Sequence, residues 1–260
     1  MNLNLAMVQM QRHQYDDAIE RFKRAYQAEP KNPIVLSNLG FAFYQRGGWQ
    51  ESANYLERAL AETKGSPLAD QVDVTGLHNQ LGYCYLQLGR QEAAMGHFKE
   101  ACNEGSGIDC HQRLGEMYFQ GGMWDDAIRE MMSVLKVKRD DPNLYGVLGV
   151  SLAQKGKIPE ALSAFDEGLR RTSDKKYAAG FHRNKANLYM QNNQIDSAKK
   201  EFHFALSLDW NSAESHFGLA LAYLASNQAQ EARQSLKNTL TLDPSHQKAK
   251  EMLTKLEGGK

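Results

Sequence analysis

The chain has 260 residues, 42% of them hydrophobic, and its 31 basic and 31 acidic side chains give a net charge of zero. This composition is ordinary for a chain that buries a hydrophobic core, and it lacks the basic excess typical of nucleic-acid-binding domains. The sequence contains no run of eighteen apolar residues. We therefore expect no nucleic-acid partner and no membrane-spanning helix.

A pattern recurs from the first residues to the last. Its fullest copies contain a Leu-Gly step, an aromatic residue three positions later, a Gly four positions beyond it and a small residue five further, and the pattern weakens in the last two copies. That last small residue falls at Ala18, Ser52, Ala94, Ala127, Ala161, Ala198 and Ala232. Successive copies are 34, 42, 33, 34, 37 and 34 residues apart, so the two long intervals hold insertions, near residues 63–74 and 171–178.

Each copy predicts two helices. Apolar residues recur every three or four positions, the period of a helix with one buried face, and the Gly marks the turn between the helices. Pro33 and Pro142 each follow a residue suited to an N-cap, and Pro159 opens a second helix. We expect seven helix pairs and a closing helix that together form a single domain over the whole chain. The approximate boundaries are 1–32, 33–66, 75–107, 108–141, 142–175, 179–212 and 213–244, with the closing helix at 245–257.

This pattern resembles the tetratricopeptide repeat over nearly the whole chain. The third copy carries the matching residues Leu81, Gly82, Tyr85, Gly89, Ala94, Phe98 and Ala101. The resemblance implies an all-α fold, a right-handed superhelical α-solenoid in which no unit buries its apolar face alone. The family's late Pro occurs only at Pro30 and Pro244. Its early Trp is replaced by Leu36, His78, His111, Tyr145, His182 and His216.

Four of these replacements are histidines, which raises the question of a metal site. Packed helices lie about 8–10 Å apart and equivalent positions lie farther apart still, whereas each zinc ligand must approach to about 2 Å. Neighbouring units therefore cannot share a metal through these residues. We interpret the histidines as partly buried packing residues and predict no metal site among them.

Cys102 and Cys110 flank a stretch of turn-forming residues, NEGSGID, that should bring them side by side. The stretch is similar to Sel1-like repeats, and that similarity implies a disulfide across the turn. Free thiols, or a zinc site with His111, are the alternatives. A disulfide indicates an oxidising compartment and favours the periplasm or cell envelope, whereas free thiols favour the cytoplasm. We expect Cys84 to be a buried lone thiol.

In tetratricopeptide repeats the first helix of each unit lines a concave groove, and residues three or four apart on it contact the partner. The resemblance places these candidate partner-binding residues in the groove: Phe41, Tyr44, Asn79, Tyr83, Leu86, Gln112, Glu116 and Phe119. The last unit offers Phe217, Leu221 and Leu224. An exposed aromatic strip is typical of a binding surface, and packing between neighbouring helices is the alternative.

Polar residues add to this set. In six of the seven repeats a glutamine stands two residues after the position that the pattern assigns to the aromatic residue: Gln11, Gln45, Gln87, Gln120, Gln154 and Gln191. Amides both donate and accept hydrogen bonds, so this series could hold an extended peptide backbone or satisfy helix C-terminal carbonyls. Arg183 and Asn187 resemble the first half of a carboxylate-binding clamp, although Gly218 stands where a further Asn is needed. The candidates therefore include Gln45, Gln87, Gln120, Arg183 and Asn187.

The sequence contains no phosphate-binding loop, no Gly-x-Ser-x-Gly and no His-Glu-x-x-His motif. We expect a non-catalytic protein–protein interaction module that binds a partner protein or peptide segment in its groove, as an adaptor or assembly factor. No cofactor and no small-molecule substrate are expected. Residues 1–130 carry a net charge of −5 (12 basic, 17 acidic) and residues 131–260 a net charge of +5 (19 basic, 14 acidic). This asymmetry favours weak self-association or reflects uneven composition alone.

Two narrower interpretations stay open. The enlarged interval followed by LGYC looks like the pilotins of type IV pili, bacterial lipoproteins that assist assembly of an outer-membrane secretin, although their lipid-bearing Cys is not in this chain. Alternatively, the chain is a regulatory domain of a larger enzyme or signalling protein. The first unit begins inside its first helix, so we expect further sequence upstream in the native protein.

Overall fold

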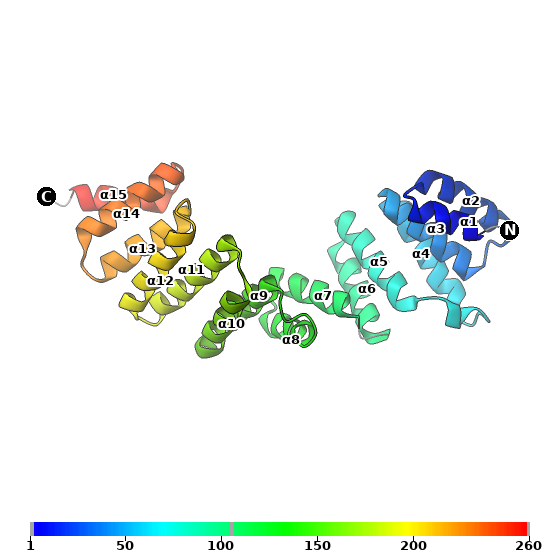
Figure 1. Cartoon of the computed structure of the whole chain (residues 1–260), viewed down its shortest axis with the longest axis horizontal. Helices are drawn as coiled ribbons and strands as arrows, with labels where there is room; N and C mark the ends of the chain where they lie inside the picture. Colours follow the sequence, from blue (N-terminus) through cyan, green and yellow to red (C-terminus); the bar gives the residue numbers. More distant parts are fainter. Residues whose placement is uncertain (1–2, 105–106, 259–260) are drawn as a thin grey trace. The chain divides into compact units, whose positions relative to one another are not determined.

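The computed structural model describes residues 3–104 and 107–258, and within these ranges the chain is helical with no strand (Figure 1). The helices follow one another as seven pairs and a last helix, which confirms the predicted all-α repeat fold. The pairs are α1 (Leu3–Gln11) and α2 (Tyr15–Ala28), α3 (Pro33–Arg46) and α4 (Trp49–Thr63), α5 (Val74–Gln87) and α6 (Gln91–Glu104), α7 (Ile108–Gln120) and α8 (Trp124–Leu135), α9 (Pro142–Gln154) and α10 (Ile158–Arg171), α11 (Lys175–Gln191) and α12 (Ile195–Leu208), and α13 (Ala213–Ala225) and α14 (Ala229–Leu242), followed by α15 (Gln247–Gly258).

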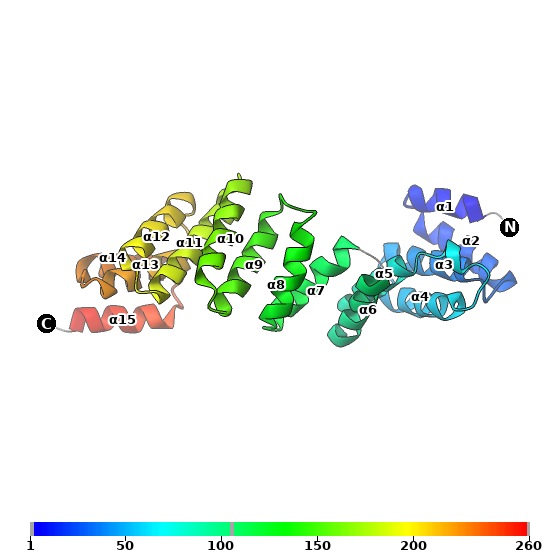
Figure 2. The same ribbon diagram turned by 90° about the horizontal axis from the view of Figure 1, so that it is seen from below.

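The chain divides into two compact units, Met1–Met117 and Tyr118–Lys260, and the boundary falls within α7. Within each unit, successive helices pack against one another in chain order, as can be followed from α1 to α6 and from α8 to α15 in Figure 2. None of the helices in the described ranges is both long and apolar enough to cross a membrane.

One residue between the two helices of each pair adopts a left-handed backbone conformation. Its φ is positive in all seven pairs: His13 (59°), Gly47 (84°), Gly89 (73°), Gly122 (70°), Gly156 (71°), Asn193 (56°) and Asn227 (59°). Glycine reaches this conformation without strain because it has no Cβ, and Asn and His are among the side chains that tolerate it best. The predicted turn Gly is therefore replaced only by residues that can adopt the same backbone conformation.

The core is built around one large side chain in the second helix of each pair. This side chain lies four residues after the small repeat residue and is less than 2% exposed in every pair: Phe22, Leu56, Phe98, Met131, Phe165, Phe202 and Leu236. Glycines of the Leu-Gly step make room for it. A Cβ on Gly82 would lie 2.6 Å from Cε1 of Phe98, and a Cβ on Gly149 would lie 2.4 Å from Cε1 of Phe165. Such distances are too short for close-packed interiors, so the aromatic rings require these glycines.

Side-chain caps begin the helices where the sequence predicts them. The Oδ1 atom of Asn32 accepts a hydrogen bond from the backbone N–H of Ile34 at 2.9 Å, and Asp141 Oδ1 accepts one from the N–H of Asn143 at 2.9 Å. In each case a proline stands at the start of the helix. Its missing N–H removes one of the unpaired donors of the first turn.

The two insertions are absorbed in different ways. The first forms a loop with a short 3₁₀ turn, η1 (Ala69–Gln71), before α5, and Asp73 caps α5 by accepting a hydrogen bond from the N–H of Gly76 at 2.8 Å. The second lengthens α11 to 17 residues, with Asp174 as its cap. The long α11 thus gains residues at its beginning that have no counterpart in α5.

Candidate partner-binding site

Four side chains of the first unit form a strip across three successive first helices: Phe41 and Tyr44 of α3, Tyr83 of α5 and Arg113 of α7. We call this set the tyrosine–arginine strip. The rings of Phe41 and Tyr44 are stacked with centroids 6.5 Å apart. Arg113 Nε donates a hydrogen bond to the Tyr83 hydroxyl at 2.8 Å, and the guanidinium carbon lies 5.1 Å from the Tyr83 ring centroid. All four side chains are half-buried, so each presents part of its surface to solvent.

Charge interactions extend and fix the strip. Glu116 accepts a hydrogen bond from Nη1 of Arg113 at 2.8 Å and another from the Gln112 amide at 3.2 Å. Burial disfavours the charge on Arg113, but its hydrogen bonds to Tyr83 and Glu116 outweigh burial and raise its pKa. Burial also raises the pKa of Tyr44, and the neighbouring Tyr83 adds to this effect. At neutral pH the strip therefore offers a fixed cation together with the protonated hydroxyl of Tyr44.

Sequence reasoning missed Arg113. A polar residue precedes the Leu of the Leu-Gly step in the second, third and fourth repeats, at Asn38, Gln80 and Arg113. This regularity could have indicated that the residue before Leu faces the same side as the aromatic candidates. Its contact with Tyr83 depends on how α5 and α7 pack, and a local motif does not carry that information.

The remaining candidates of the first unit differ in their exposure. Leu86 is half-buried, and Gln45 and Gln87 are exposed at the ends of their helices. The Oδ1 atom of Asn79 is buried and has no hydrogen bond among the described residues. A Cβ on Gly107 would lie 3.8 Å from the Asn79 amide nitrogen, so Asn79 faces the turn that leads into α7.

The six repeated glutamines share one environment. Each is exposed, and in the described part of the chain none has a hydrogen-bond partner for its side-chain amide: Gln11, Gln45, Gln87, Gln120, Gln154 and Gln191. The structure therefore leaves these amides available to a partner.

Phe119 and Tyr44 occupy equivalent positions in their own repeats. The Phe119 ring packs edge-on against Trp124 with centroids 5.8 Å apart, and the Tyr44 ring packs edge-on against Trp49 with centroids 5.4 Å apart. In both cases the Trp opens the second helix of the pair. Each aromatic candidate is thus held against the helix turn of its own repeat.

The candidates of the later repeats are engaged differently. Nη1 of Arg183 lies 3.5 Å from the Ser212 hydroxyl and 3.9 Å from a carboxylate oxygen of Glu214, at the start of α13. Asn187 is exposed. Phe217 packs against His246, with ring centroids 4.4 Å apart, and joins the cluster under α15. Arg183 therefore has partners within the chain, whereas Asn187 is open to solvent.

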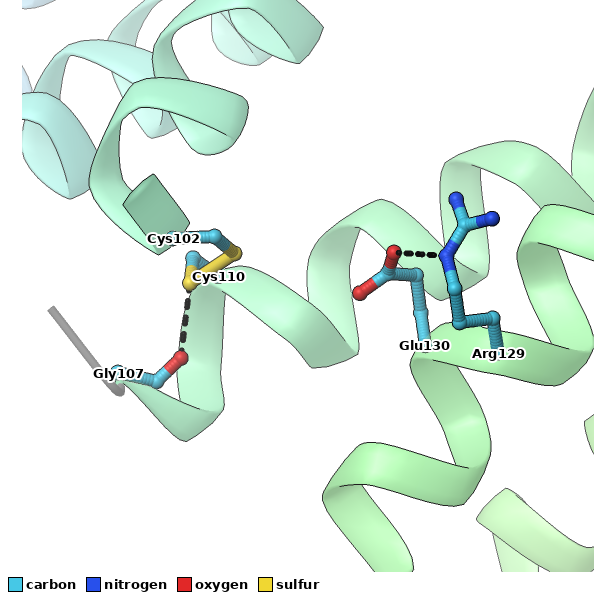
Figure 3. Close-up of a disulfide and its surroundings, with 5 residues drawn as sticks. All are labelled: Cys102, Gly107, Cys110, Arg129 and Glu130. Carbon is cyan, nitrogen blue, oxygen red and sulfur yellow. Dashed lines mark hydrogen bonds and ion pairs between the residues drawn. A yellow bond between two sulfur atoms is a disulfide. The ribbon is translucent and has the colours of Figure 1, made fainter. Parts of the chain in front are cut away.

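The structure joins Cys102 and Cys110 in a disulfide with a Cα–Cα distance of 5.7 Å (Figure 3). The Cys110 sulfur lies 2.8 Å from the carbonyl oxygen of Gly107, a contact rather than a hydrogen bond because a disulfide sulfur carries no hydrogen. His111 stands close to both sulfurs, with all three potential ligand atoms within 4.8 Å of one another. Zinc binds cysteine as a thiolate, so the disulfide form does not supply this ligand set. Cys84 is a buried thiol that donates to the Ser52 hydroxyl at 3.3 Å.

Three of the four repeated histidines contact another group of the protein. His78 Nδ1 lies 3.0 Å from His97 Nδ1, His182 Nδ1 lies 2.6 Å from a carboxylate oxygen of Glu201, and His216 Nε2 lies 3.0 Å from the Trp210 carbonyl oxygen. Burial lowers the pKa of His78, His97 and His216. These side chains hold helices together rather than facing a common centre.

A buried ion network surrounds His182 in the second unit. Nζ of Lys185 lies 2.8 Å from Asp166 and 2.9 Å from Glu201, which also pairs with His182. The Lys185 side chain is only 11% exposed, and the other repeats have a Leu at the equivalent position. That departure was the one signal in the sequence that could have indicated this network.

A sequence model of the tetratricopeptide repeat matches residues 3–67, 113–175 and 183–246, and a second model of the same repeat matches residues 75–103. The chain therefore belongs to the tetratricopeptide repeat family.

The curated proteins that are similar to this chain include the following three. It is 24% identical over 164 residues to TPR repeat-containing protein MJ1428 of Methanocaldococcus jannaschii, covering 60% of this chain and 28% of that protein. It is 22% identical over 210 residues to the peroxisomal targeting signal receptor of Saccharomyces cerevisiae, covering 79% and 33%. It is 25% identical over 130 residues to anaphase-promoting complex subunit CDC16 of the same yeast, covering 49% and 15%. The chain thus spans about a third or less of these relatives.

Solved structures of other proteins show the same fold, and two of them serve as examples. The C-terminal part of a TPR repeat-containing protein from Cytophaga hutchinsonii superposes with a TM-score of 0.74 at 17% identity, covering 96% of this chain and 98% of that one. MamA from Desulfovibrio magneticus RS-1 superposes with a TM-score of 0.60 at 17% identity, covering 67% and 98%.

Proposed function

We propose that this chain is an adaptor or assembly factor that binds a segment of a partner protein on the tyrosine–arginine strip. Proteins of this family are in general non-catalytic interaction scaffolds. Of the curated relatives, one is a subunit of a complex and another is a receptor for a targeting signal. These names support a protein-binding role in general, and the strip supplies the specific surface.

The observation that carries the proposal is the contact between Tyr83 and Arg113. It places a half-exposed ring and a charged guanidinium on neighbouring helices, with Tyr44 on the next helix. Tyr and Arg are enriched among residues that dominate binding energy, because both bury large surfaces while keeping a polar end. The exposed amides of Gln45 and Gln87 can hydrogen-bond a peptide backbone beside them. This combination suits an extended segment with aromatic or acidic side chains.

The test is a cross-linked pull-down from the native source with identification by mass spectrometry. The tagged wild type is compared with Tyr83→Ala/Arg113→Ala and with a matched control, Phe204→Ala/Trp210→Ala, which removes two exposed aromatic residues of the second unit (56% and 63% exposed). Partners lost from the first variant and kept by the second support the proposal, provided both variants melt near the wild-type temperature. Partners kept equally by both variants contradict it.

A narrower candidate is a pilotin-like role in the cell envelope, and the Cys102–Cys110 disulfide is the observation that favours it. Disulfides persist in oxidising compartments and are rare in the cytosol. Recovery of a secretin among the strip-dependent partners would support this role. Recovery of cytosolic partners alone, together with free thiols at both positions in the native protein, would contradict it.

A further inference from the structure

The second unit contains a hollow of about 460 Å³ between α9 and α11. Two helical glycines, Gly146 and Gly180, face it, and the exposed Tyr177 forms one wall. Asn143, Asn184 and Lys176 also line it. The hollow lies at the second insertion, which lengthens α11 at its beginning and so supplies Lys176 and Tyr177.

The two glycines have no packing role. A Cβ on Gly180 would meet nothing within 4 Å, and one on Gly146 would meet only Phe181 at 3.6 Å. By contrast, a Cβ on Gly149 or Gly218 in the same unit would come within 2.4 Å of a buried ring. Glycine weakens a helix interior relative to alanine. The fold alone therefore does not require Gly146 or Gly180, and their shared effect is to keep the hollow open.

The first unit holds a hollow at the equivalent repeat positions, but it is largely filled. Gly76 and Gln80 of α5 correspond to Gly180 and Asn184 of α11, and this hollow measures about 190 Å³. A Cβ on Gly76 would lie 2.3 Å from a carboxylate oxygen of Asp73, the cap of α5. In the second unit the cap, Asp174, stands a turn earlier along the longer helix. The insertion thus moves the cap away and leaves the second hollow open.

Three polar side chains around the open hollow have no bonding partner among the described residues. Neither the Asn143 nor the Asn184 side-chain amide has a hydrogen-bond partner in the part of the chain that the structure describes, and Lys176 has no ion pair there. Lys175 adds a second cation beside it. Residues 118–260 carry 20 basic and 17 acidic side chains, a net charge of +3. The carboxylates of Asp141 and Asp174, close in sequence to these lining residues, are engaged as the caps of α9 and α11. Lys176 therefore suits an anionic group, the two amides suit a peptide backbone, and the space above the glycines suits a bulky apolar side chain.

We propose that this hollow binds an extended segment of a partner protein in which a bulky apolar side chain is flanked by Asp or Glu. The apolar side chain occupies the space above Gly146 and Gly180 against Tyr177. The neighbouring carboxylate lies at Lys176, and Asn143 and Asn184 hydrogen-bond the backbone. This inference rests on the proposed function only in that the ligand is a protein, because the hollow and the tyrosine–arginine strip use different residues.

The test selects phage-displayed random twelve-residue peptides on the immobilised full chain and measures the enriched peptides by fluorescence polarisation. We expect an apolar residue next to Asp or Glu to be enriched. Gly180→Leu should weaken binding at least tenfold because it fills the hollow, and Lys176→Glu should weaken it by reversing the charge. Gly180→Ala is the matched control: it should raise the melting temperature and weaken binding less than Leu does.

Enriched peptides that bind Gly180→Leu as tightly as wild type would overturn the proposal, and so would enrichment of basic peptides. Loss of a wild-type dimer in Gly180→Leu, seen by light scattering, would identify a second copy of this chain as the occupant and would also overturn it. Tyr83→Ala separates the two proposals. If peptide binding is weakened by Gly180→Leu but not by Tyr83→Ala, the proposal for the hollow is supported whatever the result of the pull-down. If lysate partners are lost from Tyr83→Ala and no selected peptide binds Gly180→Leu more weakly, only the proposal for the tyrosine–arginine strip is supported.

Discussion

The same repeat position holds a histidine in both units, yet the two histidines have different partners. In the first unit His78 faces His97, and in the second His182 faces Glu201. Each pair joins the two helices of one repeat across 19 residues. Repeat geometry therefore determines which positions meet, and the residue at the second position determines the chemistry. One arrangement is a pair of half-buried imidazoles, and the other is part of an ion network with Lys185.

The largest expected effect is in the ion network. Lys185→Ala leaves Glu201 buried with only His182, and we expect the free energy of unfolding to fall by about 3 kcal/mol, the lower end for a broken buried pair because Asp166 is half-exposed. Urea denaturation measures this change. The control Lys185→Leu/Glu201→Leu removes both buried charges and should cost less than Lys185→Ala. A loss below about 1 kcal/mol in Lys185→Ala would mean that the network behaves as an exposed salt bridge.

The disulfide should contribute nearly as much to the first unit. Closing the short loop between Cys102 and Cys110 restricts the unfolded chain, which corresponds to about 2–3 kcal/mol in the chain-entropy model. Cys102→Ser/Cys110→Ser should therefore lower the urea midpoint. Cys84→Ser removes a thiol outside the disulfide, so it should lose stability in reductant as the wild type does, whereas the double variant should be equally stable with and without reductant. A double variant as stable as the oxidised wild type would contradict this estimate.

Matched glycine substitutions distinguish packing from open space. Gly82→Ala places a Cβ against the fully buried Phe98 and should cost about 2 kcal/mol through overpacking. Gly180→Ala meets no atom and should stabilise the chain by about 1 kcal/mol through helix propensity. Thermal melts of the two variants measure both signs. Effects of the same sign would contradict the contrast between the two glycines.

The smallest effect is a difference in pH dependence. Burial lowers the pKa of His78 and His97 below the ordinary 6.5. Below pH 6.5 the unfolded chain therefore binds more protons than the folded chain, and the stability of the fold decreases as the pH is lowered. Burial opposes the charge of Glu201, but hydrogen bonds from His182 and Lys185 outweigh it and lower its pKa below 4.5. Stability from Glu201 is therefore present above 4.5 and is lost only below it.

Urea midpoints between pH 7.5 and 4 measure this difference. His78→Asn/His97→Asn should flatten the decline just below pH 6.5, whereas Glu201→Gln should change the curve only below about pH 4.5, near the ordinary pKa of a glutamate. An unchanged decline in the histidine variant would show that other groups cause it.

Helix pairs, turns and core positions could be predicted because they depend on local spacing. The positive φ at Gly89, the cap at Asn32 and the buried Phe98 all follow from residues within one repeat. The disulfide was one of three alternatives, since sequence spacing brings the cysteines together without determining their chemistry. The structure adds the pairing of Cys102 with Cys110.

The candidate site was only partly predictable, because its contacts join different repeats. Tyr44 and Tyr83 belong to a visible pattern, whereas Arg113 acquires its role from the packing of α7 beside α5. Lys185 departs from the Leu of other units, but its partners on α10 and α12 could not be read from that departure.

The most direct test of the strip is the dissociation constant of a strip-dependent partner, measured by calorimetry with wild type and Tyr83→Ala. If Tyr83 anchors the partner, the constant should rise about thirtyfold, as expected for the loss of about 2 kcal/mol at a binding hot spot. The exposed Phe204→Ala should leave it within about twofold, the range of energetically neutral positions. An unchanged constant in a folded Tyr83→Ala would contradict the assignment of binding to the tyrosine–arginine strip.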